Sequence, residues 1–386
     1  MGPARRLGME QMRCGRQPSR AGVTGALRRL ACASAVVLAL TYAALSSAQA
    51  QIVPTPAPTP TPGITIVSSR ISVDNAVTNL GSGYLERLTN QATNSIDRIG
   101  RNNPGGGGAS QTTEPTKVRV WTEGYGISAT TSPRGDFAGD RRTTRGGVVG
   151  AGATVMPGVN LGLSIDHSRS KIDVPLAFQS ATLDLTQVGA TFSVDKGPWT
   201  VAGAFVHGFG NVNSVRDTGA SLANAYYNAR IDGGLVELSY YWTQGQSRIV
   251  PKVAFEYVRS STDAFKEIGP AFFLVTASDA WAERARILAG AEIGHYFLID
   301  RKILDLSAYG KFIDNVAQNF GAVTVSIPGF QPVSVQGIGE SQYGADAGAA
   351  ASLILSNNFR VYAHYDGKFR SQYQSHQGTV GLEIKW

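Results

Sequence analysis

The stretch FRVYAHYDGKFR, residues 359–370, alternates between two kinds of side chain along its whole length. Its odd positions are apolar or aromatic apart from Gly367. Its even positions are all polar: Arg360, Tyr362, His364, Asp366, Lys368 and Arg370. Successive side chains of a β-strand point to opposite faces of the sheet, so this stretch predicts a strand with lipid on one side and water on the other. Such strands are typical of transmembrane β-barrels.

The same alternation recurs along the chain from Lys117 to Trp386. Clear examples are NLGLSIDHSRS (160–170), PKVAFEYVR (251–259) and ILDLSAYGKF (303–312). The segment 223–242 keeps the alternation only if its register slips near Gly233 and Gly234. We therefore expect a β-bulge at that pair of glycines.

Two kinds of connection separate these stretches, and the two kinds take turns along the chain. Tight turns are expected at 156–160, 195–198, 243–247, 298–302 and 356–359. Longer loops are expected at 129–144, 174–181, 216–222, 261–272, 315–333 and 371–375. One short rim and one long rim is the asymmetry of an outer-membrane barrel. The pattern thus predicts an all-β domain over 117–386, a twelve-stranded antiparallel transmembrane β-barrel in the lipid bilayer of the cell outer membrane.

Aromatic residues gather at the rim with the tight turns, where a membrane-interface girdle is expected. They include Trp199, Tyr240, Tyr241, Trp242 and Trp386. The last strand, GTVGLEIKW (378–386), ends the chain on one of them. Its pattern resembles the signal that the barrel-assembly machinery reads, carried here by Thr379, Gly381, Leu382, Ile384 and Trp386. A frayed last strand would also leave backbone groups unpaired in hydrocarbon.

Charged and polar residues at the inward positions of the strands are expected to line the lumen. They are Arg119, Glu123, Arg284, Arg286, Glu292, Asp305, Lys311, Arg360, His364, Asp366 and Lys368. They have two interpretations. They either set the ion selectivity of a channel or pair with one another, as in any hydrated barrel interior. We favour mutual pairing.

Residues 1–50 are typical of a secretory signal peptide. Seven arginines stand against the single acid Glu10, an uncharged apolar run follows at 30–45, and Ala48-Gln49-Ala50 forms a small-x-small cleavage site. The apolar run is short for a membrane span. The seven arginines and Glu10 together give residues 1–50 a net charge of +6, which leaves +1 of the total +7 for residues 51–386. The sequence pI of 9.4 therefore gives no reason to expect a nucleic-acid partner, and both cysteines, Cys14 and Cys32, leave with the signal.

Between signal and barrel, three short segments are expected. Residues 51–71 form a Pro/Thr-rich, extended and disordered leader, and 101–116 form a Gly-rich linker. Residues 72–100 have helical period, with Ser72 as N-cap and Gly100 as the end. Their apolar face holds Val73, Val77, Leu80, Tyr84, Leu88, Ala92, Ile96 and Ile99. This helix either threads the pore or associates with partner helices in the periplasm; its length, close to a barrel's height, favours threading.

The opening strand KVRVWTEGYGIS (117–128), the stretch RGGVVGAGATVMPGVNLGLSIDHSRS (145–170), the twelve strands, the preceding helix and the aromatic last residue together resemble the autotransporter translocator domain of type V secretion. The resemblance implies a protein of the Gram-negative envelope, whose barrel is threaded by an N-terminal helix and displays at the cell surface whatever precedes that helix. Here only about twenty residues separate Gln51 from the helix, so the passenger is expected to be vestigial.

 The functions that these features leave open fall into three classes. We favour an autotransporter-type barrel for protein translocation or display, exported by the Sec translocon, inserted by the barrel-assembly machinery and monomeric in the membrane. The alternative is a small porin-like channel or a structural barrel with a plug helix. An outer-membrane enzyme is the third class, and Asp166-His167 and the pair His364 and Asp366 are its candidates near the outer ends of their strands.

The enzyme class has little support in the sequence. Asp166 and His167 point to opposite faces, and no nucleophile is fixed beside His364 and Asp366. The chain has no G-x-S-x-G, HExxH or Walker motif. We therefore expect no catalytic residues, no metal site and no cofactor.

Overall fold

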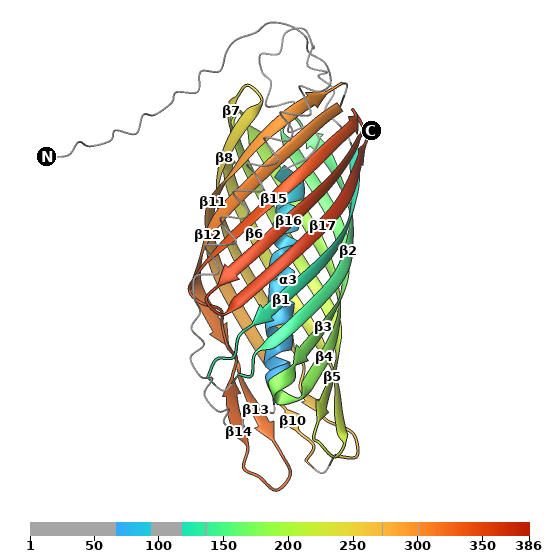
Figure 1. Ribbon diagram of the computed structural model, residues 1–386, viewed down its shortest axis with the longest axis vertical. Helices are drawn as coiled ribbons and strands as arrows, with labels where there is room; N and C mark the ends of the chain where they lie inside the picture. The colour runs from blue at the N-terminus through green and yellow to red at the C-terminus, as the bar shows by residue number, and fades with distance from the viewer. Residues whose placement is uncertain (1–66, 94–117, 136, 272, 301) are drawn as a thin grey trace, which may run out of the picture. The chain divides into compact units, whose positions relative to one another are not determined.

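The computed structural model describes residues 67–93, 118–135, 137–271, 273–300 and 302–386. One α-helix, α3 (Ser68–Thr93), lies inside a closed β-barrel (Figure 1). Within these ranges no helix combines the length and the hydropathy needed to cross a membrane. The expected signal peptide and linker lie outside the described residues, and so does the expected leader up to residue 66. The last four residues assigned to that leader, 68–71, are not disordered but belong to α3.

Twelve antiparallel strands form the barrel, as predicted. Each pairs with the next along the chain, and β8 to β11 and β17 to β1 complete the ring. A short strand, β7 (Trp242–Gln244), continues β6 along β8. The twelve are β1 (Val118–Thr131), β2 (Asp140–Met156), β3 (Val159–Val174), β4 (Gln179–Lys196), β5 (Trp199–Asp217), β6 (Leu222–Tyr240), β8 (Ser247–Thr262), β11 (Ala280–Ile299), β12 (Lys302–Phe320), β15 (Tyr343–Ser356), β16 (Phe359–Arg370) and β17 (Tyr373–Lys385).

The barrel closes between its first and last strands. β1 pairs with β17 from Arg119 opposite Lys385 to Thr131 opposite Tyr373. Beyond the ladder, the backbone N–H of Trp386 donates to the carbonyl oxygen of Val118 at 3.1 Å. The terminal tryptophan therefore takes part in the seam, and the last strand is paired on both sides, with β1 and with β16.

Side chains alternate between the two faces as the sequence predicts. On β3, Leu163 is 70% exposed on the outer face, whereas Asp166 is completely buried on the inner face. All five tight turns occur where they were expected, between β2 and β3, β4 and β5, β7 and β8, β11 and β12, and β15 and β16. These turns form one rim, which is uppermost in Figure 1.

The predicted bulge at Gly233 and Gly234 is wrong, because β6 pairs with β5 and β8 without any register shift. Toward the long-loop rim, β6 turns small and apolar residues inward, such as Ala229 and Ile231, because they pack against α3. The outward residue Arg230 lies on the exposed face. The apolar side chains therefore change from the inner to the outer face along one regular strand. In the sequence this change looks the same as a one-residue shift of the strand register.

The long-loop rim is more ordered than predicted. In the expected loop 315–333, β12 continues to Phe320. Short strands in and just beyond the expected loops 261–272 and 315–333 form a second sheet of four strands. These are β9 (Phe265–Lys266), β10 (Thr276–Ala277), β13 (Ala322–Ser326) and β14 (Val333–Gln336). The β3–β4 connection is instead short, with a 3₁₀ turn at Pro175–Ala177, and only two residues join β16 to β17.

The helix begins four residues earlier than predicted, at Ser68, so Ser72 is a buried residue inside it and not its N-cap. A barrel side chain supplies the cap instead, since the N–H of Ser69 donates to Oε1 of Gln179 on β4 at 2.8 Å. This satisfies one of the N–H groups that every helix leaves free at its start. The expected end at Gly100 lies outside the described residues.

Candidate functional site: the helix-filled lumen

The helix α3 runs from the long-loop rim to the tight-turn rim (Figure 1). At its start, Val67 and Ile71 pack with Val323 and Val335 of the second sheet. At its end, the carbonyl oxygen of Thr93 accepts a hydrogen bond from the hydroxyl of Tyr241 at 3.2 Å. Its 26 residues correspond to roughly 39 Å of helix. The helix therefore occupies the lumen along most of the barrel's height.

One side of α3 is held by apolar packing against the wall formed by β4, β5, β6 and β8. Each buried apolar side chain contributes roughly 1.5–3 kcal/mol, so this contact is a large part of the helix's attachment. The helix residues involved are Val73, Val77, Leu80, Tyr84, Leu85 and Leu88. The wall residues are Leu183, Leu185, Ala204, Ile231, Leu235 and Val258.

Glycines allow the helix to approach this wall closely. A Cβ atom on Gly81 would lie 2.2 Å from Cδ1 of Ile231, and a Cβ atom on Gly189 of β4 would lie 2.3 Å from Cδ1 of Leu88. Both distances are far below van der Waals contact. Gly81, which lowers helix propensity, is thus explained by tertiary packing.

The opposite side of α3 carries Glu86, which meets three cations of the wall. Its carboxylate lies 3.0 Å from Nζ of Lys311 on β12, 2.6 Å from Nζ of Lys368 on β16 and 2.8 Å from Nη2 of Arg286 on β11. Arg286 also pairs with the buried Glu256 of β8 at 2.7 Å. A buried charge is tolerated only when it is paired and hydrogen-bonded, and this cluster meets that condition.

The next residue, Arg87, meets an acidic part of the wall. Its Nη2 lies 2.8 Å from Oδ2 of Asp166 on β3. The hydroxyl of Tyr125 on β1 donates to the same carboxylate at 2.9 Å, and the Arg87 guanidinium lies 4.0 Å from the centre of the Tyr125 ring. Adjacent helix residues of opposite charge therefore contact opposite kinds of wall, which fixes the rotation of the helix about its axis.

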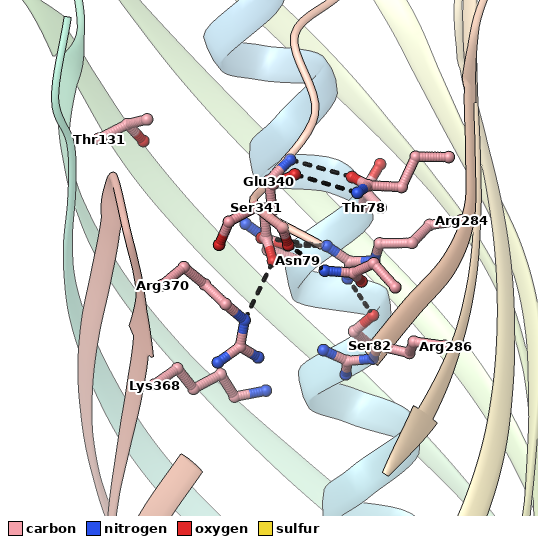
Figure 2. A network of polar contacts seen from close by, with 12 residues as sticks. Thr78, Asn79, Ser82, Thr131, Arg284, Arg286, Glu340, Ser341, Lys368 and Arg370 are labelled. Carbon is pink, nitrogen blue, oxygen red and sulfur yellow. Dashed lines mark hydrogen bonds and ion pairs between the residues drawn. The ribbon is translucent and has the colours of Figure 1, made fainter. Parts of the chain in front are cut away.

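The segment 337–342, which joins β14 of the second sheet to β15 and which we call the strap, is also connected to the helix. Glu340, between β14 and β15, pairs with Arg284 at 3.0 Å and with Arg370 at 3.5 Å (Figure 2). Arg284 in turn donates to Asn79 at 2.8 Å and to Ser82 at 2.5 Å, both on α3. Glu340 thus connects the loop at the barrel mouth to two barrel strands and, through Arg284, to the helix.

The protonation of Glu340 is shifted by this setting. Burial alone would raise the pKa of its carboxyl. The neighbouring cations, Arg284 and Arg370 first among them, outweigh this effect and lower the pKa to about 2. The backbone of Glu340 is held as well, by two hydrogen bonds with the side-chain amide of Gln318 at 2.9 and 3.0 Å. The Glu340 carboxylate therefore keeps its negative charge through the whole physiological pH range.

The structure places all the predicted lumen residues on the inner face of the barrel. Six of them form hydrogen bonds with α3 directly: Arg119, Glu123, Arg284, Arg286, Lys311 and Lys368. The others face wall residues: Glu292 and Asp305 share Arg248, Arg360 pairs with Glu383, Asp366 accepts from Tyr309, and the ring of His364 packs on Tyr362.

The candidates for catalysis lie in different surroundings. His167 is on the exposed outer face, where its ring nitrogen meets Thr186 at 3.0 Å, while Asp166 is buried beside Arg87. His364 and Asp366 lie near the middle of β16 and not at its outer end, which corrects the sequence-based placement. Among the described residues no group of three or more His, Cys, Asp or Glu side chains is arranged to hold a metal ion.

Several residues that organise the lumen were not among the predicted site residues. Glu86 and Arg87 are ordinary surface charges by sequence, and Glu340 lies in a segment with no strand periodicity. Asp166 and Arg370 could have been added, because their strands alternate clearly and both fall on the polar parity. For the helix charges, the only signal was their position on a helix expected to thread a charged pore.

One small cavity lies between α3 and the wall of β1, β2, β11, β16 and β17. It has a volume of about 40 Å³ and is lined by Asn79, Arg142, Arg284 and Glu340 among others. A space of this size holds water molecules. The helix and the side chains around it occupy the rest of the lumen at this level.

Both the sequence and the fold of this chain are similar to those of known proteins. The model of the autotransporter β-domain family matches residues 120–366. Outer membrane protein B of Rickettsia conorii is 21% identical over 287 residues, covering 69% of this chain but 17% of the relative. The translocator domain of the autotransporter NalP from Neisseria meningitidis superposes with a TM-score of 0.63 at 17% identity, covering 83% of this chain and 99% of that one. The β-domain of the Bordetella autotransporter BrkA gives 0.54 at 12% identity, covering 70% and 100%.

A twelve-stranded outer-membrane barrel, filled by a helix that precedes its first strand, is the class of protein that the fold and the lumen define. The chain belongs to the autotransporter β-domain family, whose model matches more than half of it. It is an autotransporter-type barrel of the cell outer membrane.

Proposed function

We propose that this barrel displays at the cell surface the segment that precedes α3, and that α3 stays in the lumen as a plug. The observation that supports this most directly is the direction of the helix: its N-terminal end lies at the long-loop rim, which faces outward in outer-membrane barrels. A chain entering the helix from that side comes from the cell surface. In this proposal residues 51–67, which precede α3, are a very short passenger.

The proposal includes the partners of assembly. The Sec translocon exports the chain through its signal peptide, and the barrel-assembly machinery reads Thr379, Gly381, Leu382, Ile384 and Trp386. The barrel then works as a monomer, since its strands close on themselves and leave no edge for another copy. We propose no catalytic role.

Labelling of single cysteines on intact cells tests the display. Residues 51–386 contain no cysteine, so each substitution introduces a unique thiol. We expect a membrane-impermeant maleimide to label Thr61→Cys in the leader and Gln331→Cys in the second sheet's loop. Asn357→Cys, in a tight turn at the other rim, should stay unlabelled until the cells are opened.

The three sites separate the possible outcomes. Labelling of Gln331→Cys without Thr61→Cys would place the leader inside and refute display. Labelling of Asn357→Cys alone on intact cells would mean that the tight-turn rim faces the cell surface, so that the barrel has the opposite orientation.

A further inference from the structure

The outer surface of the barrel carries charged side chains where the apolar belt ends. On β3 the outward residues Leu161, Leu163 and Ile165 are followed, toward the long-loop rim, by Arg169 and Lys171. The strand's 16 residues reach roughly 40 Å at a usual tilt, whereas the apolar band of such barrels is about 25 Å tall. These charges therefore lie at the level of the outer-leaflet headgroups.

On other strands, outward charges at this level form pairs. Nδ1 of His207 lies 2.7 Å from Asp232, and Nη1 of Arg259 lies 3.3 Å from Glu283. Arg230 lies 4.0 Å from Asp263. The two arginine–carboxylate pairs balance their own charge, and a protein surface that does so offers little attraction to an anionic lipid.

The outward face of β2 and β3 is different. It holds four exposed cations, which we call the cationic patch: Arg141, Arg145, Arg169 and Lys171. Arg169 pairs with Asp184 at 2.6 Å. In the part of the chain that the structure describes, the other three have no carboxylate within ion-pair distance, although Asp173 lies opposite Arg141 in the ladder. The patch thus has four cations against two carboxylates.

The arrangement within the patch points to an anion. Arg145 on β2 lies directly opposite Arg169 on β3, and like charges in directly opposite positions destabilise a sheet. An anion between them would remove that repulsion, and guanidinium groups bind phosphate through two parallel hydrogen bonds. Beside Arg145, the neighbouring outward position on β1 is Gly126, itself opposite Gly378 on β17. The bare backbone there leaves room for a bulky headgroup.

We propose that the cationic patch binds the phosphate of a phosphorylated glycolipid in the outer leaflet, between Arg145 and Arg169 with Lys171 beside them. The commitment to a lipid, and not to free phosphate, follows from the apolar surface directly below the patch. Val149 and Ile165, 54% and 51% exposed, continue the same two strands toward the membrane centre, where they contact acyl chains.

Native mass spectrometry of the full chain in detergent tests this proposal, with lipid A as the probe. Its matched comparison lipid is lipid A from which both phosphates have been removed. We expect the wild type to bind the phosphorylated form at least about tenfold more tightly, and the double variant Arg145→Gln, Lys171→Gln to lose about tenfold of that affinity.

The control variant is Arg230→Gln, Arg259→Gln, which removes the same number of charges from the paired part of the surface. It should bind lipid A like the wild type. All four side chains are exposed, and heat-modified mobility on a gel verifies that each variant is folded. Equal loss in both variants, equal binding of the dephosphorylated lipid, or displacement of lipid A by millimolar inorganic phosphate would each overturn the proposal.

Discussion

Glu86 and Arg87 show how single residues hold the plug. Consecutive side chains leave a helix about 100° apart, so these two face different parts of the lumen. Glu86 meets Lys311, Lys368 and Arg286, and Arg87 meets Asp166. If the helix were rotated about its axis, each of the two charges would face wall residues of the same charge or uncharged residues. A buried charge without a partner costs several kcal/mol.

Replacing Glu86 should therefore loosen the helix. In Glu86→Gln three buried cations lose their shared carboxylate, and we expect a loss of about 3 kcal/mol, seen as a lower temperature of heat modification in detergent. The matched control is Glu283→Gln, which breaks the partly exposed outer pair with Arg259 and should cost less than about 1 kcal/mol. Equal effects of the two changes would contradict the role given to Glu86.

The strap residue Glu340 gives a pH dependence of known sign. Its pKa falls from the ordinary 4.5 to about 2 in the folded protein, so its contribution to stability is complete above pH 4.5 and is lost as the pH falls toward 2. We expect the difference in unfolding temperature between wild type and Glu340→Gln to be constant at neutral pH and to shrink between these two values. A difference that grows on acidification would show the opposite linkage.

At the scale of elements, strand periodicity predicted most of the barrel because lipid outside and water inside impose one rule on every strand. It failed on β6, where the helix makes the lumen apolar beside Ile231 and the headgroup region makes the outside polar at Arg230. It also missed the second sheet, whose strands are as short as two residues at β9. The start of α3 was misplaced because its cap, Gln179, comes from another element.

The contact between α3 and β6 can be tested with two glycines of the same helix. A Cβ on Gly81 meets Ile231 at 2.2 Å, whereas a Cβ on Gly83 has its nearest neighbour, Nη1 of Arg87, at 3.8 Å. Gly83→Ala should stabilise the protein by about 0.5–1 kcal/mol through helix propensity. Gly81→Ala should lose that gain to the clash, measured as unfolding temperature in detergent.

A second change at the wall separates the clash from other causes. Ile231→Val removes the Cδ1 atom that the new methyl group would meet. We expect Gly81→Ala to be better tolerated in the Ile231→Val background than in the wild type, which a double-mutant cycle measures as a coupling free energy. Zero coupling would mean that the helix does not approach β6 as closely as described.

For the whole molecule, the sequence predicted which residues face the lumen but not which partners they have. Inward parity is a local property of a strand, and it placed Arg284, Lys311 and Lys368 on the inner face. Their partners, Glu86 and Glu340, come from the helix and the strap, whose positions depend on the closed barrel. The pairing of lumen charges was expected in general, but its organisation around one helix is a property of the assembled fold.

This organisation predicts how the pore behaves when the plug is removed. Deletion of residues 68–93 takes away the apolar contacts with β4 to β8 and the partners of the basic wall, and it should open a water-filled passage. In planar bilayers we expect stable conductance from the deleted protein and none, or rare brief openings, from the full chain. Deletion of residues 51–66 alone is the matched control and should leave the pore closed, because α3 and its contacts remain. Equal conductance of all three proteins would mean that α3 does not block the lumen in the membrane.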